Sequence, residues 1–147
     1  MQFFNTDDLK DNEIQLVLLA THEENKERKW VPYYQFNICL LDGTKIGFSN
    51  LRIDNSDLTK YCGNIGYEID EIYRGKHYSL KASKLLLKLA KKHNLNYVLI
   101  NCEPNNIASN KICQSLKAKY VETVDIPETH EMYQEGKRQM NIYKIDL

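Results

Sequence analysis

The stretch from Arg74 to Ser79 combines residue types that bind anions. It reads Arg74-Gly75-Lys76-His77-Tyr78-Ser79 and lies between an apolar strand pattern and a long helical pattern. The first N–H groups of a helix have no acceptor within the helix, and the peptide dipoles place partial positive charge there. The chain from residue 74 to 92 contains no Asp or Glu, and its basic residues are Arg74, Lys76, Lys81, Lys84, Lys88, Lys91 and Lys92. We therefore predict a phosphate site at this turn, with a solvated lysine face as the alternative.

One carboxylate is well placed for proton transfer. Glu68 lies in the apolar segment 65–69, where strand alternation puts it on the same face as Gly66 and Asp70. If that face lines a cleft, removal of water would make Glu68 suitable as a general base, directly or through a water molecule. An ordinary solvated glutamate is the alternative.

A strand, a helix and a second strand would position these residues. Segment 65–69 predicts the first strand, and the continuous apolar run Tyr97-Val98-Leu99-Ile100 predicts a second, buried strand. Between them, apolar residues recur at helical spacing and form one stripe: Ala82, Leu85, Leu86, Leu89 and Ala90. Asn94 can close this helix in the left-handed conformation. The three elements predict a right-handed crossover.

The remaining segments predict further strands and one more helix. Segments 34–41 and 45–51 flank Asp42-Gly43 and predict a hairpin, and 13–19 predicts an earlier strand. Residues 107–116 predict a short helix with Ala108, Ile112 and Leu116 on one face, and 119–124 and 141–145 predict the last strands. We therefore expect the 147 residues to form a single α/β domain, 1–147.

Composition excludes several classes of protein. Lys plus Arg and Asp plus Glu are both 20, so no basic field favours nucleic acid as a partner. The first residues do not resemble a signal peptide and no apolar run is long enough to span a membrane, so we expect a cytoplasmic protein without a membrane partner. The four cysteines form no CxxC pair and do not cluster with histidines, which predicts buried or idle thiols and no metal.

The order of these elements, followed by Asn106-x-Ala108-Ser109 at the start of the second helix, resembles the GNAT family of acyl-CoA-dependent N-acetyltransferases. The resemblance covers 34–147 and looks closest to small bacterial members, with the tail pattern Val124-Asp125-Ile126-Pro127-Glu128 and then Met132-Tyr133-x-x-Gly136-x-Arg138. The family's pyrophosphate turn, Gln/Arg-x-x-Gly-x-Gly/Ala, matches Arg74 to Ser79. His77 and Ser79 replace two of its small residues.

The resemblance implies a mixed, mostly antiparallel sheet flanked by helices, with a βαβ core that binds acetyl-CoA as co-substrate. The backbone near Ile69 and Glu71 would hold the pantetheine arm like an added strand. The pyrophosphate would lie on Arg74, Gly75, Lys76, His77, Tyr78 and Ser79. On the second helix, Asn106, Ser109 and Lys111 would contact the coenzyme, with simple capping as the alternative.

The resemblance also implies an acid that protonates the departing thiolate. Many family members have a tyrosine four residues after the serine of the Asn-x-x-Ser motif, and this chain has Cys113 there. A buried core cysteine is the alternative interpretation of Cys113. Tyr78 and Tyr120 are substitute candidates, although no spacing supports either.

The implied function is acetyl transfer to a primary amine of a small molecule or peptide. The segment 120–136 contains no Lys or Arg, which favours a cationic acceptor unless it is only a solvated loop; its acidic residues are Glu122, Asp125, Glu128, Glu131 and Glu135. The alternative is a CoA-binding GNAT-fold regulatory module with little or no turnover, because Cys113 and His77 depart from the family pattern. A nucleotide-binding regulatory domain is a third hypothesis, without a Walker motif to support it. Monomer and homodimer are both open.

Overall fold

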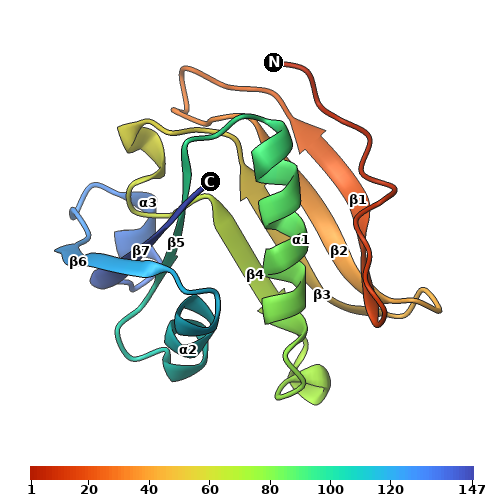
Figure 1. The fold of residues 1–147 in the computed structure, drawn as a ribbon. Helices are drawn as coiled ribbons and strands as arrows, with labels where there is room; N and C mark the ends of the chain where they lie inside the picture. The colour runs from red at the N-terminus through yellow and green to blue at the C-terminus, as the bar shows by residue number, and fades with distance from the viewer.

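The computed structural model describes all 147 residues and contains two antiparallel sheets. The first sheet has the order β1-β2-β3-β4 and consists of β1 (Ile14–His22), β2 (Tyr33–Leu40), β3 (Lys45–Arg52) and β4 (Ile65–Ile69). The second has the order β5-β7-β6 and consists of β5 (Tyr97–Cys102), β6 (Lys119–Asp125) and β7 (Gln139–Asp146). The predicted mixed α/β fold with mostly antiparallel strands is confirmed, and its sheet is divided into two parts (Figure 1).

The predicted hairpin is formed by β2 and β3. Leu40 N donates to Thr44 O at 2.8 Å and Gly43 N donates to Leu40 O at 3.0 Å. Gly43 has a φ of 95°, a conformation that glycine adopts without steric cost. Strand β1 pairs along β2 and continues to His22, three residues beyond its predicted end.

Helix α1 (Tyr78–Lys92) lies across one face of the four-stranded sheet (Figure 1). Its buried side chains are the five predicted from the apolar stripe together with Ser83. Asn94 has a φ of 57° just after the helix, as predicted for the residue that closes it. The helix end is also tied to the sheet, because Tyr34 Oη and His93 Nε2 form a hydrogen bond of 2.6 Å.

Strands β4 and β5 begin side by side and then part. Asn64 N donates to Leu99 O at 2.7 Å, and Leu99 N donates to Asn64 Oδ1 at 2.8 Å. A Cβ on Gly63 would lie 2.9 Å from Leu99 O, so only glycine fits at this junction. Beyond it, β4 pairs with β3 and β5 pairs with β7. A gap therefore opens toward the C-terminal ends of β4 and β5, where α1 and α2 (Ile107–Ser115) begin.

Helix α2 faces the core differently from its predicted stripe. Cys113 is its only fully buried residue, Ile112 and Leu116 are half-buried and Ala108 is exposed. The predicted apolar face of α2 was therefore wrong, because the innermost residue of the helix is Cys113, one position after Ile112. None of the helices has the length and apolar character that a membrane span requires.

Three short helices were not predicted: η1 (Asp57–Thr59), η2 (Glu71–Tyr73) and α3 (Glu131–Gln134). The last of these is held by a small separate core of Ile126, Met132 and Met140. The main core lies between α1 and the sheets. Helix α3 thus has its own anchor, which includes Met140 on β7 and Ile126 just after β6.

Candidate active site

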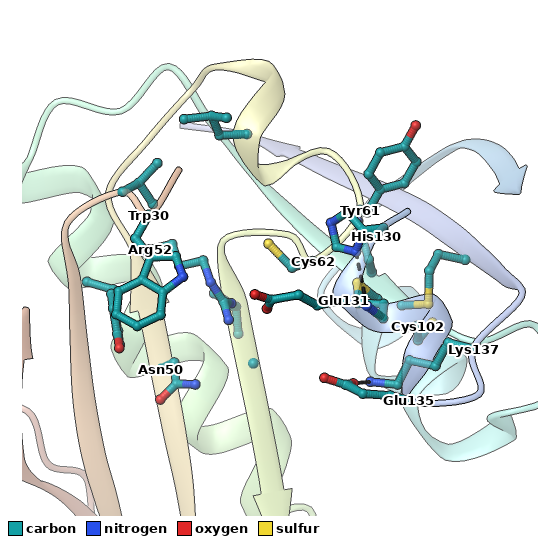
Figure 2. A pocket seen from close by; sticks show the side chains of 18 of the residues that line it. Trp30, Asn50, Arg52, Tyr61, Cys62, Cys102, His130, Glu131, Glu135 and Lys137 are labelled. Atoms are coloured by element: carbon teal, nitrogen blue, oxygen red, sulfur yellow. Dashed lines mark hydrogen bonds and ion pairs between the residues drawn. The ribbon is translucent and has the colours of Figure 1, made fainter. Parts of the chain in front are cut away.

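A cleft of about 960 Å³ lies between the two sheets and extends to the gap between β4 and β5. Its floor is formed by Asn50, Arg52 and Gly66 from the first sheet. Cys102, Asn106 and Ser109 line it from β5 and α2. Its other wall comes from the segment that contains α3 (Figure 2). The cleft therefore joins residues from both halves of the chain.

One edge of β4 has no partner strand. The hydrogen bonds Arg52 N to Asn64 O and Asp70 N to Ile46 O, both 2.8 Å, show that the even-numbered residues of β4 turn their backbone groups toward β3. The backbone groups of Tyr67 and Ile69 therefore point into the gap toward β5. Ile69 O is already bonded to Arg74 Nε at 2.8 Å. The remaining groups form a free strand edge, which can pair with an extended ligand.

Several backbone N–H groups at the start of α1 are free to donate hydrogen bonds. The backbone N–H groups from Gly75 to Leu80 have no acceptor in the protein, and no side chain caps the helix. The first backbone bond of the helix is Lys81 N to His77 O at 3.1 Å. Gly75 and His77 both have positive φ, 84° and 64°. Consecutive free N–H groups at a helix start bind phosphate groups well.

His77 occupies the left-handed conformation in which glycine is usual. Its side chain is exposed and makes no capping hydrogen bond. Lys76 is also exposed, Ser79 is half-buried, and Tyr78 packs against the main core. The turn therefore presents backbone groups and flexible basic side chains to the solvent.

The start of α2 is capped, in contrast to that of α1. Asn106 Oδ1 accepts a hydrogen bond from Ser109 N at 3.1 Å, so the predicted capping role is present. Asn106 and Ser109 also line the cleft, whereas Lys111 is exposed and lies outside it. The helix is fixed by Asn110, whose Oδ1 accepts from Tyr143 Oη at 2.8 Å and from Asn141 Nδ2 at 2.9 Å.

Tyr67 lies where the strands part, and it was not among the predicted site residues. Burial raises the pKa of Tyr67 to about 12, although the Ser109 hydroxyl acts in the opposite direction. Strand alternation places Tyr67 on the same face as Ile65 and Ile69, opposite Glu68. A tyrosine among apolar strand residues was the available signal, because its hydroxyl needs a polar partner.

Two cysteines meet beside Tyr67. Cys102 on β5 lines the cleft, and Cys113 on α2 is completely buried. A hydrogen bond from the Cys113 thiol lowers the pKa of Cys102, and the same contact together with burial raises the pKa of Cys113. Cys113 itself does not line the cleft, which disfavours it as a proton donor to a bound ligand.

The other predicted catalytic residues lie farther from the gap. Glu68 is exposed and shares a face with Gly66, as predicted, but only Gly66 lines the cleft. Tyr120 lies on β6 outside the cleft, where its hydroxyl and that of Thr123 are 2.7 Å apart. Glu71, predicted to hold the pantetheine arm through its backbone and not to act in catalysis, begins η2 and is exposed.

The part of the cleft between β3 and α3 is here called the α3 pocket and is lined by Trp30, Asn50, Arg52, His130 and Glu131. Of the five predicted acidic residues, Glu131 and Glu135 line the cleft, and Glu135 forms an ion pair of 3.4 Å with Lys137. Basic side chains also line it: Arg28, Lys29, Arg52 and Lys137. The cleft is therefore of mixed charge and not simply acidic. No group of three or more His, Cys, Asp or Glu residues could hold a metal ion.

Comparison with known proteins identifies the family. The sequence model described as the acetyltransferase (GNAT) domain matches residues 1–119. A search of curated proteins found no match. Among solved structures, RimL, a ribosomal L7/L12 alpha-N-protein acetyltransferase in complex with coenzyme A disulfide-bonded to one of its cysteines, is similar with a TM-score of 0.66 and 14% identity. The match covers 93% of this chain and 96% of that one.

Two other structures are similar in fold. The microcin C7 self-immunity acetyltransferase MccE, in complex with acetyl-CoA and AMP, has a TM-score of 0.59 and 22% identity, over 84% of this chain and 64% of that one. The ribosomal-protein-S5-alanine acetyltransferase from Vibrio fischeri has a TM-score of 0.62 and 17% identity, over 78% and 61%. The chain spans less than two thirds of the length of several matched structures. The domain match and the shared fold establish that this chain belongs to the GNAT acetyltransferase family.

Proposed function

We propose that this protein is an acetyl-CoA-dependent N-acetyltransferase that acts on a primary amine. The observation that carries the proposal is the set of free N–H groups from Gly75 to Leu80 beside the free edge of β4. A phosphate group and an extended amide chain are the ligands that these two features match. The complexes of RimL with coenzyme A and of MccE with acetyl-CoA support the same choice of ligand.

Acetyl-CoA would supply the activated acetyl thioester. Its pyrophosphate would accept hydrogen bonds from the turn, where a Cβ added to Gly75 would meet nothing within 4 Å, so the space above the backbone is open. The Nη groups of Arg74 are available to the same phosphates, because only Nε is bonded to Ile69 O. The pantetheine amides would pair with the backbone of Tyr67 in the gap.

Two proton transfers need residues of this chain. Tyr67 is neutral at physiological pH, as a tyrosine ordinarily is, and burial raises its pKa further. It can therefore donate a hydrogen bond or a proton to the departing sulfur, with Ser109 as the adjacent hydroxyl. We retain Glu68 as the proposed base for the ammonium, acting through water, because it lies one pleat beyond Gly66 on the same face.

The experiment combines ligand binding with turnover. Acetyl-CoA should raise the melting temperature, since a ligand present at a hundredfold excess over Kd adds about 2.7 kcal/mol to the free energy of unfolding. Acetyl-pantetheine, which lacks the nucleotide diphosphate, is the control ligand and should give a much smaller shift. No shift with millimolar acetyl-CoA would contradict the proposal.

Turnover is then measured by chromatographic separation of CoA from acetyl-CoA, because the four free cysteines of the protein would react with thiol reagents. A panel of amines should release CoA faster than the protein-free solution. Binding of acetyl-CoA without any release would instead support the regulatory module.

A further inference from the structure

A guanidinium lies on the floor of the α3 pocket without a carboxylate beside it. Arg52 is the last residue of β3 and is half-buried. Its Nη1 lies 3.5 Å from Gly63 O, and none of the ion pairs in the protein includes it. A partly buried cation usually has an anionic partner. The guanidinium of Arg52 can therefore bind an anionic group of a ligand, because no carboxylate of the protein pairs with it.

The space in front of Arg52 is open and close to the gap. A Cβ on Gly66 would lie 4.0 Å from Arg52 Nη1 and 3.9 Å from Asn50 Nδ2, and no other atom lies nearer. Gly66 immediately precedes Tyr67, which lies at the point where β4 leaves β5. The N–H donors of Arg52 and Asn50 therefore lie beside the open surface at Gly66, one residue before Tyr67, where acetyl transfer is proposed.

A free carboxylate lies on the opposite wall. Glu131 is the first residue of α3, it is exposed, and none of the ion pairs includes it. Figure 2 shows its side chain directed across the pocket toward Arg52. The start of α3 is fixed, because His130 Nδ1 accepts from Met132 N at 3.1 Å and Met132 is buried. The pocket thus presents one cation and one anion that face each other and do not form an ion pair.

These charges discriminate between kinds of amine. Arg52 would repel an acceptor whose only charge is an ammonium group, because the two like charges would approach in a partly desolvated pocket. An acceptor that also carries an oxyanion removes this repulsion, and a planar guanidinium matches a carboxylate or phosphate with two hydrogen bonds. The pair of opposite charges therefore suits a zwitterion.

We propose that the acceptor is a small zwitterionic amine that carries a carboxylate or phosphate-type group near its amino group. Arg52 binds the oxyanion and Glu131 binds the ammonium before its deprotonation. This inference rests on the proposed acetyltransferase function and names the substrate class of the same site. It replaces the simply cationic acceptor that the acidic segment 120–136 suggested.

The test uses acceptors that share a side chain and differ in one group. Glycine and the L-amino acids that carry a primary amine are compared with their carboxamides, their decarboxylated amines and the corresponding 1-aminoalkylphosphonates. Release of CoA from acetyl-CoA gives kcat/KM for each acceptor with the full-length protein. We expect at least one carboxylate or phosphonate acceptor to exceed its carboxamide and its decarboxylated amine by tenfold or more. The ratio between carboxylates and phosphonates then tells which oxyanion the pocket prefers.

Arg52→Gln should lower kcat/KM for the anionic acceptor by 10- to 100-fold and change that of the carboxamide by less than threefold. Arg28→Gln is the matched control, because Arg28 lines the same cleft but lies over the Trp30 ring at 4.9 Å, and it should preserve the ratio. If Arg52→Gln does not fold, Arg52→Lys keeps the charge without the planar guanidinium and should give a smaller loss. Glu131→Gln should raise KM more than it lowers kcat.

The outcomes separate this inference from the function on which it rests. Faster acetylation of carboxamides or decarboxylated amines than of the anionic compounds would overturn the inference and leave the acetyltransferase function intact. If no amine is acetylated although acetyl-CoA binds, thermal shift with CoA and the anionic amines is the deciding measurement. No added stabilisation by any of them would also overturn the inference. Failure of acetyl-CoA itself to bind would contradict the function.

Discussion

Arg74 Nε donates a hydrogen bond of 2.8 Å to the carbonyl oxygen of Ile69, so the arginine side chain folds back against the end of β4. The bond leaves both Nη groups available and ties the phosphate turn to the strand that forms the gap. Arg74 therefore has a structural role and a proposed binding role that one substitution removes together.

Arg74→Ala should weaken acetyl-CoA binding by roughly 1–3 kcal/mol, because it removes a charge-assisted contact with phosphate. The loss should be larger at low salt, where charge interactions are less screened. Calorimetric titration at two salt concentrations measures it, and Lys111→Ala on exposed α2 is the control for loss of a positive charge. An unchanged Kd would show that Arg74 does not bind the phosphates and that its role is the hydrogen bond to Ile69 O.

His77→Gly should relieve the strain of the left-handed conformation, since an L-residue at a φ of 64° costs roughly 1–2 kcal/mol. The flexibility of glycine in the unfolded chain offsets part of this gain. We expect a net change in unfolding free energy below about 1 kcal/mol by urea denaturation. His77→Ala, which keeps the strain, should be less stable than His77→Gly.

The same two variants test whether the imidazole binds phosphate. If it does, wild-type acetyl-CoA affinity should increase as the pH falls from 8 to 6, because the protonated imidazole is favoured beside phosphate. Both variants should lack this increase. Equal pH dependence in all three proteins would show that His77 contributes only its backbone.

Tyr67→Phe should retain acetyl-CoA binding and lower kcat by roughly 10²-fold or more if the hydroxyl acts as the acid. It should also change stability in alkali. Above pH 10 the unfolded tyrosine ionises while the native one stays neutral up to its pKa of about 12. Native stability should therefore fall by about 1.4 kcal/mol per pH unit between pH 10 and 12.

Tyr67→Phe should lose less free energy of unfolding in alkali than the wild type, because it has no hydroxyl at this position to ionise. Urea unfolding at pH 9 and pH 11 measures the difference. Tyr120→Phe is the control, because Tyr120 is exposed on β6. Identical alkaline profiles for wild type and Tyr67→Phe would contradict the burial argument.

Cys113→Ala should shift the alkylation of Cys102 to higher pH, because it removes the hydrogen bond that lowers the pKa of Cys102. Iodoacetamide labelling followed by mass spectrometry across pH 6–9 measures this shift. Cys62, which lines the cleft separately, serves as the internal reference. Acetyl-CoA should slow the labelling of Cys102 if it occupies the gap, and a rate unaffected by the ligand would exclude binding there.

Glu68→Gln should leave acetyl-CoA binding intact and reduce turnover by roughly 10²–10⁴-fold, the usual contribution of a positioned base. Because Glu68 is exposed and outside the cleft lining, this substitution is a strict test of its proposed role. Turnover close to that of the wild type would remove Glu68 from the mechanism.

Local patterns were sufficient to predict most of the fold. The hairpin around Gly43 and the helix that buries Leu85 and Leu89 depend on residues close together in the sequence, and both are present. The turn from Arg74 to Ser79 was placed between a strand and a helix for the same reason, and its binding of phosphate stays a prediction. Helix α3 was not predicted, because its four residues are too few for a helical pattern and are held by the cluster of Met132 with Ile126 and Met140.

The site required information that the sequence does not carry locally. Tyr67 and Ser109 come together only because β4 and β5 separate after Asn64. Arg52 is proposed to bind the acceptor because it has no anionic partner in the protein. The absence of a partner can be recognised only from the three-dimensional structure around Arg52. Cys113 was a candidate acid by spacing, and the orientation of α2 turns it into the core.

The most direct test of the central claim follows acetyl transfer itself. Mass spectrometry and liquid chromatography would quantify CoA and acetylated amine after incubation of the protein with acetyl-CoA and the amine panel. The account predicts that the two products form in equal amounts and faster than without protein. Acetyl-CoA that is consumed no faster than in the protein-free control, for every acceptor, would contradict it.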